Sequence, residues 1–297
     1  MKKKGLLFLA LPMLALALVA GIMVYAVQGA HAASPKTHML GVKNHPSRYS
    51  GGGNNLNYNG GPVMTGTTRA YAIFWEPSGS YVSPTYNSLI DRYFGDVGTS
   101  ALYRNNTQYT DTSGKAPSGA VFGGSWVDTS AYPSSTLLDN DIHNEVTKAQ
   151  QQKGWKSSIH NIFFVFTAKN ENICYDSQNC SFTVFCAYHG FFGTNTIYAA
   201  MPYTGTNLAA CGVNNSPNND FDADSTINVT SHEQMEAATD PLLNAWYDAG
   251  GAEIGDKCAW TFGPLNSQGG DVSWHKHPYI VQEEWDNKVG GCVVKGP

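Results

Sequence analysis

The residues of this chain with the clearest chemical potential are His232, Glu233 and Glu236, which form an H-E-x-x-E pattern. In an α-helix, residues four apart lie on one face, so the imidazole of His232 and the carboxylate of Glu236 can bind the same ion. Glu233 is offset from His232 by about 100°, from which a carboxylate reaches a metal-bound water rather than the metal. The pattern predicts a metal-binding helix with Glu233 as general base. An ordinary solvated helix face is the alternative, because His and Glu are common surface residues.

A third metal ligand is expected from the carboxylates that follow the helix. Asp256 is the first candidate and Glu253 the second, because both lie in a short segment punctuated by glycines. Asp240 is less suitable, since it lies eight residues after His232 and drifts away from the same helix face. For each carboxylate the alternative is a role in a turn or a helix cap.

The predicted ligands define the chemistry that the site could perform. One His and two carboxylates bring two negative charges, so harder divalent metals are acceptable, although zinc remains the favoured ion. A zinc-bound water activated by Glu233 would attack a peptide bond, which predicts a secreted metal-dependent endopeptidase with a polypeptide substrate. The developing oxyanion requires a further hydrogen-bond donor. Candidates for that donor and for substrate contacts are His189, Tyr247, His275 and His277.

Strands that alternate with helices must position these residues. Unbroken apolar runs predict strands buried on both faces, at residues 70–75, 162–166 and 196–201. Apolar residues at helical spacing predict helices at residues 84–94 and 134–152. A third helix is predicted at residues 227–239, where capping residues come before the helix and Pro241 prevents its simple continuation. Asp224 and Ser225 are suitable caps for the last of these helices. The alternation predicts an α+β fold with a mixed central sheet covered by helices.

The N-terminus has the pattern of an export signal. Lysines at positions 2–4 precede an apolar stretch from Leu6 to Val27, and Ala30-His31-Ala32 has the small-residue pattern of a cleavage site. This predicts a signal peptide over residues 1–32 and a secreted, extracellular protein. The apolar stretch is also long enough to cross a bilayer, so membrane contact through an uncleaved leader is the alternative.

The part of the chain after the leader is expected to form one domain with an appended arm. Residues 33–61 are polar and rich in Gly and Asn, which is typical of a flexible arm, and residues 62–297 are long enough to bury a sizeable core. The formal net charge is −5, and without the three leader lysines it becomes −8 (−5 − 3). This negative charge argues against nucleic acid as a partner.

The six cysteines all lie between positions 174 and 292, and an even number in an exported chain predicts three disulfides. Sequence alone leaves many pairings open. Local closure would stabilise the loops by pairing Cys174 with Cys180, Cys186 with Cys211, and Cys258 with Cys292. A cysteine-bound structural metal is the alternative, although the chain contains no C-x-x-C pair.

Several of these segments resemble the phosphate-induced, Exordium-like family of secreted proteins. The most specific block runs from Ser231-His232-Glu233-x-x-Glu236 to Glu253-Ile254-Gly255-Asp256-x-Cys258. Residues 60–75 and 186–199 are similar to that family's opening and middle segments. The resemblance implies an extracellular or cell-wall-associated protein with a zincin-like core, and it implies no defined reaction.

A non-catalytic binding protein with a vestigial or structural metal site is the second functional hypothesis. Its partner would be a cell-wall component, because aromatic side chains near the C-terminus could stack on sugars. These side chains are Trp246, Trp260, Trp274, Tyr279 and Trp285. The alternative for them is packing in the core.

Overall fold

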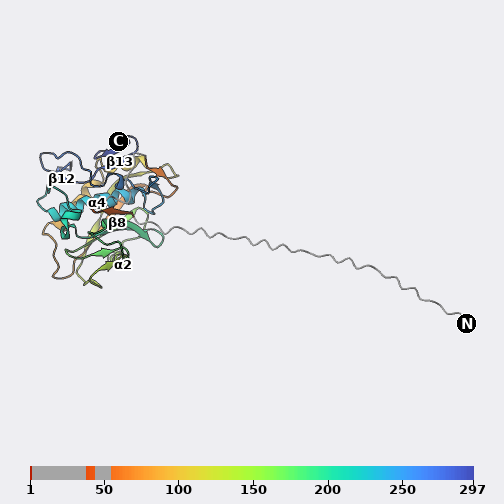
Figure 1. The fold of residues 1–297 in the computed structure, drawn as a ribbon, viewed down its shortest axis with the longest axis horizontal. Helices are drawn as coiled ribbons and strands as arrows, with labels where there is room; N and C mark the ends of the chain where they lie inside the picture. The colour runs from red at the N-terminus through yellow and green to blue at the C-terminus, as the bar shows by residue number, and fades with distance from the viewer. Residues whose placement is uncertain (2–37, 44–54) are drawn as a thin grey trace. The chain divides into compact units, whose positions relative to one another are not determined.

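A computed structural model describes Met1, residues 38–43 and residues 55–297 of this chain (Figure 1). Nearly all of the expected signal peptide lies outside the described residues, and so do residues 33–37 and 44–54 of the expected arm. Among the described residues, none of the helices combines the length and the apolar character needed to span a bilayer.

A six-stranded sheet with the order β1-β8-β9-β6-β3-β4 forms the centre of the domain. Strands β9, β6, β3 and β4 run parallel to one another, whereas β8 is antiparallel to both β9 and β1. The predicted mixed sheet is therefore confirmed, and the three predicted strands lie in β3, β6 and β9. The sheet consists of β1 (His38–Gly41), β3 (Gly66–Trp75), β4 (Pro117–Asp128), β6 (Asn161–Thr167), β8 (Phe185–Phe192) and β9 (Thr196–Met201).

Helices cover both faces of this sheet. Alternate residues of β3 point into two different cores: Ala72 and Phe74 into the first, Ile73 and Trp75 into the second. Helices α1 (Tyr86–Val97) and α4 (Phe221–Thr239) pack in the first core, and α2 (Asp139–Lys153) packs in the second. Figure 1 shows α2 and α4 on opposite sides of β8. Burial on both faces explains why the central strands are apolar throughout, as predicted.

Two of the predicted helices are present and end close to the expected residues, although α2 begins five residues later than Ser134. Helix α1 begins at Tyr86 and continues through Gly95, the expected end, to Val97. Helix α2 begins at Asp139, because Leu137 and Leu138 form a short strand, β5. It ends before Gly154, whose φ of 71° is the left-handed conformation expected of a C-terminal glycine.

The third predicted helix, α4, begins six residues earlier than expected, at Phe221 rather than Ile227. Its N-cap is Asp220, whose carboxylate accepts a hydrogen bond of 3.0 Å from the amide of Ala223. The predicted caps, Asp224 and Ser225, are wrong because both residues lie inside the helix.

Every residue of α4 from Ala223 to Thr239 is buried, although many of them are polar. Threonine hydroxyls on this helix bond to the backbone of the preceding turn: Thr226 to the carbonyl of Asp222 at 2.9 Å, and Thr230 to that of Thr226 at 2.7 Å. Because these hydroxyl groups have hydrogen-bond partners, burying them costs little free energy. The helix is therefore a central element of the core, and the solvated-face interpretation is wrong.

The described parts of residues 33–61 belong to the domain. Strand β1 pairs with β8 at the sheet edge, and β2 (Asn57–Tyr58) pairs with β10 (Trp246–Tyr247). Leu40 is fully buried in the first core. The domain therefore begins before residue 62, and these stretches are not a flexible arm. The sequence signal is the alternate spacing of the buried residues Leu40 and Val42, of which Leu40 lies in β1 and Val42 just after it.

All three expected disulfides are present: Cys174–Cys180, Cys186–Cys211 and Cys258–Cys292. This confirms both their number and the local pairing.

The remaining elements are short and lie mainly in the C-terminal part of the chain. They are η1 (Tyr103–Gln108), β7 (Ile173–Cys174), η2 (Thr204–Thr206), α3 (Leu208–Cys211), η3 (Asp256–Cys258), β11 (Val272–Trp274), β12 (His277–Tyr279), β13 (Glu284–Asp286) and β14 (Gly291–Val293).

Candidate metal centre

The H-E-x-x-E residues lie in the middle of α4, fully enclosed by the core. His232, Glu233 and Glu236 are each 0% exposed. The helical spacing brings His232 Nε2 to 3.0 Å from Glu236 Oε1, the convergence expected for two ligands of one ion. The helix contacts both β8 and β1 of the sheet, so residues on those strands can face this pair.

Two further histidines, on neighbouring sheet strands, face these residues. His189 on β8 lies directly opposite His38 on β1 in the antiparallel register. His189 Nδ1 is 3.2 Å from Glu233 Oε2 and 3.6 Å from Glu236 Oε2. The sequence predicts His189 only as a hydrogen-bond donor to an oxyanion or a substrate. Its position among the carboxylates makes it a candidate metal ligand instead.

The segment after α4 brings Glu253 and Asp256 to the same place. Glu253 Oε2 lies 3.3 Å from His38 Nδ1 and 3.8 Å from His189 Nε2. Asp256 Oδ2 lies 3.6 Å from His38 Nδ1, and the Asp256 amide donates a hydrogen bond of 2.9 Å to Glu236 Oε1. Both proposed third ligands therefore reach the cluster.

Gly255 allows this segment to approach the helix. A Cβ atom at this position would lie 2.6 Å from His232 Nδ1 and 3.0 Å from Glu236 Oε1. Such contacts are closer than side chains tolerate without displacement. Glycine is therefore required here by the close approach to His232 rather than by its backbone conformation, which has φ −80°.

The cluster offers ligand atoms at separations that suit a bound cation. Two atoms that bind one zinc ion at about 2.1 Å in tetrahedral geometry lie roughly 3.4 Å apart. The nitrogen to oxygen distances within the cluster run from 3.0 to 3.8 Å. Three trios have ligand atoms within 4.8 Å of one another: His38, Glu253 and Asp256; His189, Glu236 and Glu253; and His232, Glu233 and Glu236.

Many polar atoms of the cluster lack a hydrogen bond of acceptable geometry. Both ring nitrogens of His232 and both carboxylate oxygens of Glu253 are among these buried atoms, as are Glu233 Oε1 and Glu236 Oε2. Buried polar groups without partners are costly and uncommon in folded proteins. A divalent cation would satisfy several of these atoms together, including one ring nitrogen of His232, so the residues fit a metal ion.

The pKa values of these groups reflect a buried excess of acid. Burial alone lowers the pKa of His232, but the charges of Glu236 and Glu233 outweigh burial and raise that pKa to about 10. Burial, followed by the charges of Glu236 and Asp240, raises the pKa of Glu253 well above its ordinary value. Positive charge from protons or from metal ions would therefore stabilise the cluster. Protons are expected to compete with the metal for these groups at low pH.

Glu284 on β13 is a member of this environment that sequence reasoning missed. It is fully buried, and neither of its carboxylate oxygens has a hydrogen bond. Burial raises its pKa well above the ordinary value, and the nearby charge of His232 opposes that rise. No local pattern marked Glu284, because it lies in an ordinary stretch, Gln282-Glu283-Glu284-Trp285.

The other candidate residues divide between the cluster and distant sites. The Tyr247 ring lies 6.5 Å from the His38 ring, at the border of the cluster. Asp240 Oδ1 accepts hydrogen bonds from the amides of Asn244 and Ala245, so Asp240 has the expected turn role. His277 pairs with Asp96 at 2.6 Å, away from the cluster.

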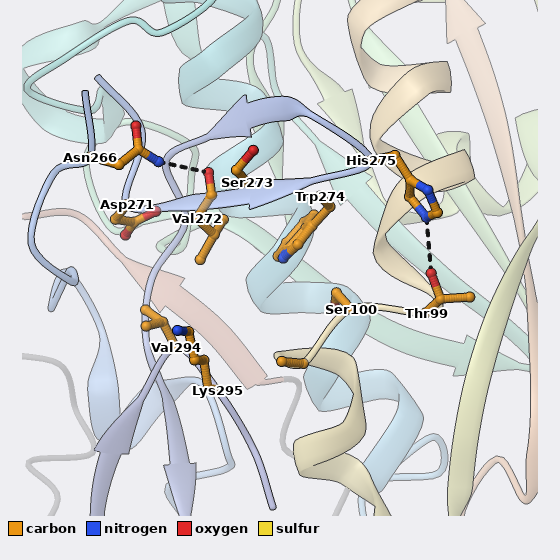
Figure 2. A pocket seen from close by; sticks show the side chains of 11 residues that line it. Thr99, Ser100, Asn266, Asp271, Val272, Ser273, Trp274, His275, Val294 and Lys295 are labelled. Carbon is orange, nitrogen blue, oxygen red and sulfur yellow. Dashed lines mark hydrogen bonds between the residues drawn. The ribbon is translucent and has the colours of Figure 1, made fainter. Parts of the chain in front are cut away.

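A separate pocket of about 570 Å³ lies beside the β11–β12 hairpin and contains none of the cluster residues. Figure 2 shows Trp274 and His275 at this hairpin, with the 3.0 Å hydrogen bond between His275 Nε2 and Thr99 Oγ1. His275 therefore cannot serve the cluster. The C-terminal aromatics expected to stack on sugars belong mainly to the core: Trp274, Tyr279 and Trp285 are core residues, and Trp246 and Trp260 are partly buried and pack against the core.

Two plant proteins are similar to this chain over most of its length. Protein EXORDIUM-like 3 of Arabidopsis thaliana is 24% identical over 282 residues, which cover 80% of this chain and 82% of that protein. Protein EXORDIUM-like 5 of the same plant is 23% identical over 239 residues, which cover 70% of this chain and 65% of that protein. No protein-family profile matches the chain. No solved structure matches it either, so the zincin-like core stays a prediction. This chain is therefore similar to the Exordium-like proteins.

Proposed function

We propose that this chain is an extracellular Exordium-like protein in which a buried divalent metal ion, with zinc favoured, holds the core together. The observation that carries this proposal is the enclosed set of histidines and carboxylates with unsatisfied polar atoms. When bound, the ion would supply positive charge and a ligand for these atoms. Three disulfides support an oxidising, extracellular location.

The burial of the site favours a structural role for the metal. His232 and Glu236 come from α4, His189 from β8, and Glu253 from the segment that follows α4. An ion among them would cross-link elements far apart in sequence, as structural zinc sites do. Catalytic zinc instead keeps a position open to water and substrate. Full burial of His232, Glu233 and Glu236 is more consistent with the closed type.

Removing the metal is expected to destabilise the protein strongly. An ion present at about a thousand times its Kd contributes roughly 4 kcal/mol, equivalent to a melting temperature shift on the order of 10 °C for a domain of this size. The disulfide-bonded protein should carry at least one equivalent of metal by elemental mass spectrometry. Dipicolinate should remove that metal and lower the melting temperature, and added zinc should restore it. A metal-free protein that neither binds zinc nor responds to it would contradict the proposal.

A metal-dependent endopeptidase is the second candidate, and the environment of Glu233 favours it. Glu233 follows His232 directly, and its Oε1 atom has no hydrogen bond, as a general base awaiting a water would require. In this mechanism His189 Nδ1, 3.2 Å from Glu233 Oε2, would orient the carboxylate and influence its proton affinity. Opening of the core around the site would have to precede substrate binding.

The Glu233→Gln variant separates the two candidates, because glutamine keeps the size of the side chain but cannot accept a proton. If the protein is a peptidase in which Glu233 is the base and not a metal ligand, hydrolysis of an unfolded protein substrate should fall by about 10²-fold or more while the metal content stays near that of the wild type. Equal hydrolysis by both proteins would exclude Glu233 as the base. A fully metal-loaded wild type that cleaves no peptide library would favour the structural role.

A further inference from the structure

The three metal-binding trios are arranged as a chain. The trio of His38, Glu253 and Asp256 shares no residue with the trio of His232, Glu233 and Glu236. The trio of His189, Glu236 and Glu253 takes one carboxylate from each of them. A single small ion would engage one trio and leave ligand atoms of the other two without a metal.

The side chains of the first and third trios come from different parts of the fold. His232 and its two glutamates lie within α4, whereas His38 lies on β1 and Asp256 begins η3. Between them, His189 directs Nδ1 toward Glu233 and Glu236, and Nε2 toward Glu253, at 3.2 to 3.8 Å. His189 thus separates two groups of carboxylates, each with its own histidine.

The charge of the cluster also exceeds what one divalent ion neutralises. The trios contain four carboxylates, Glu233, Glu236, Glu253 and Asp256, which carry four negative charges when ionised. One divalent ion leaves two of these charges, and two ions leave none. Uncompensated charge in a fully buried site is strongly unfavourable. Both Glu253 oxygens also lack a hydrogen bond, which is an independent sign of a ligand on that side of the cluster.

We propose that the centre holds two divalent cations: one bound by His232, Glu233 and Glu236, and a second bound by His38, Glu253 and Asp256. This inference rests on the proposed metal-binding function and assigns a new site within it. His189, Glu236 and Glu253 form the connection between the two ions.

The number of ions is measured by titrating zinc into the metal-free, disulfide-bonded chain and recording native mass spectra. The expected result is saturation at two zinc ions per chain. Saturation at one ion would overturn the inference and leave the proposed function intact, whereas no bound zinc would contradict both. Because this measurement uses the wild type, it does not depend on the folding of a variant.

Single histidine variants assign each ion to its site. His38→Ala and His232→Ala should each bind one zinc ion, and His143→Ala should still bind two, because His143 lies on α2 and pairs with Asp139 instead. His38→Ala with two bound ions would overturn the assignment of the second site. Loading the wild type with manganese should also give a spin-coupled electron paramagnetic resonance spectrum. Two uncoupled manganese signals would place the ions in separate sites and overturn the shared centre.

Discussion

Glu236→Gln is expected to lower the bound metal by at least one equivalent per chain. Glu236 belongs to two of the three trios, and its Oε1 lies 3.0 Å from His232 Nε2. Glutamine keeps the volume and can still accept the hydrogen bond from the Asp256 amide, so the change removes chiefly a charged ligand. Losing one protein ligand forfeits a large share of the metal-binding free energy. Elemental mass spectrometry of the purified variant measures the effect.

The same substitution at Glu145 provides the control. Glu145 is a buried carboxylate on α2, 3.8 Å from Lys148 and outside the three trios. Glu145→Gln should retain the metal content of the wild type, so a general effect of neutralising a buried glutamate can be separated from ligand loss. If Glu236→Gln retains as much metal as the wild type, the ion lies elsewhere and the proposed centre is wrong.

Gly255→Ala is expected to weaken metal binding by about tenfold or more and to destabilise the fold by about 1–3 kcal/mol. The added methyl group would lie 2.6 Å from His232 Nδ1 and 2.7 Å from His232 Cε1, so either the imidazole or the segment carrying Asp256 must move. Displacing a ligand from its position weakens the bond to the ion. Zinc competition with a chromogenic chelator and thermal unfolding measure the two effects.

Gly95→Ala is the matched control, because a Cβ at Gly95 on α1 would meet nothing within 4 Å. Alanine is favoured over glycine inside a helix by roughly 1 kcal/mol, so this variant should be as stable as the wild type or more stable, with unchanged metal binding. Wild-type metal affinity in Gly255→Ala would show that the close approach to His232 does not organise the site.

The sequence predicted those features that depend on local spacing. Central strands such as β6 were recognisable because burial on both faces leaves an unbroken apolar run. The pairing of Cys186 with Cys211 agreed with local closure, since short loops bring cysteines together at low entropic cost. His232 and Glu236 could be placed on one helix face from the helical repeat alone, because that geometry needs no tertiary information.

The sequence also proposed Asp256 and Glu253, but only the tertiary structure decided that residues of β1, β8 and β13 join this pair. His38 and His189 are brought together by the antiparallel register of β1 and β8, and register depends on the packing of the whole sheet. Glu284 enters from a strand that carries no metal-binding pattern. The burial of α4 could not be predicted from the sequence either, because its many polar side chains leave no apolar stripe on the helix. A buried cluster of charges is created by such long-range contacts, so spacing within one helix could identify two of its ligands but not the centre that they share.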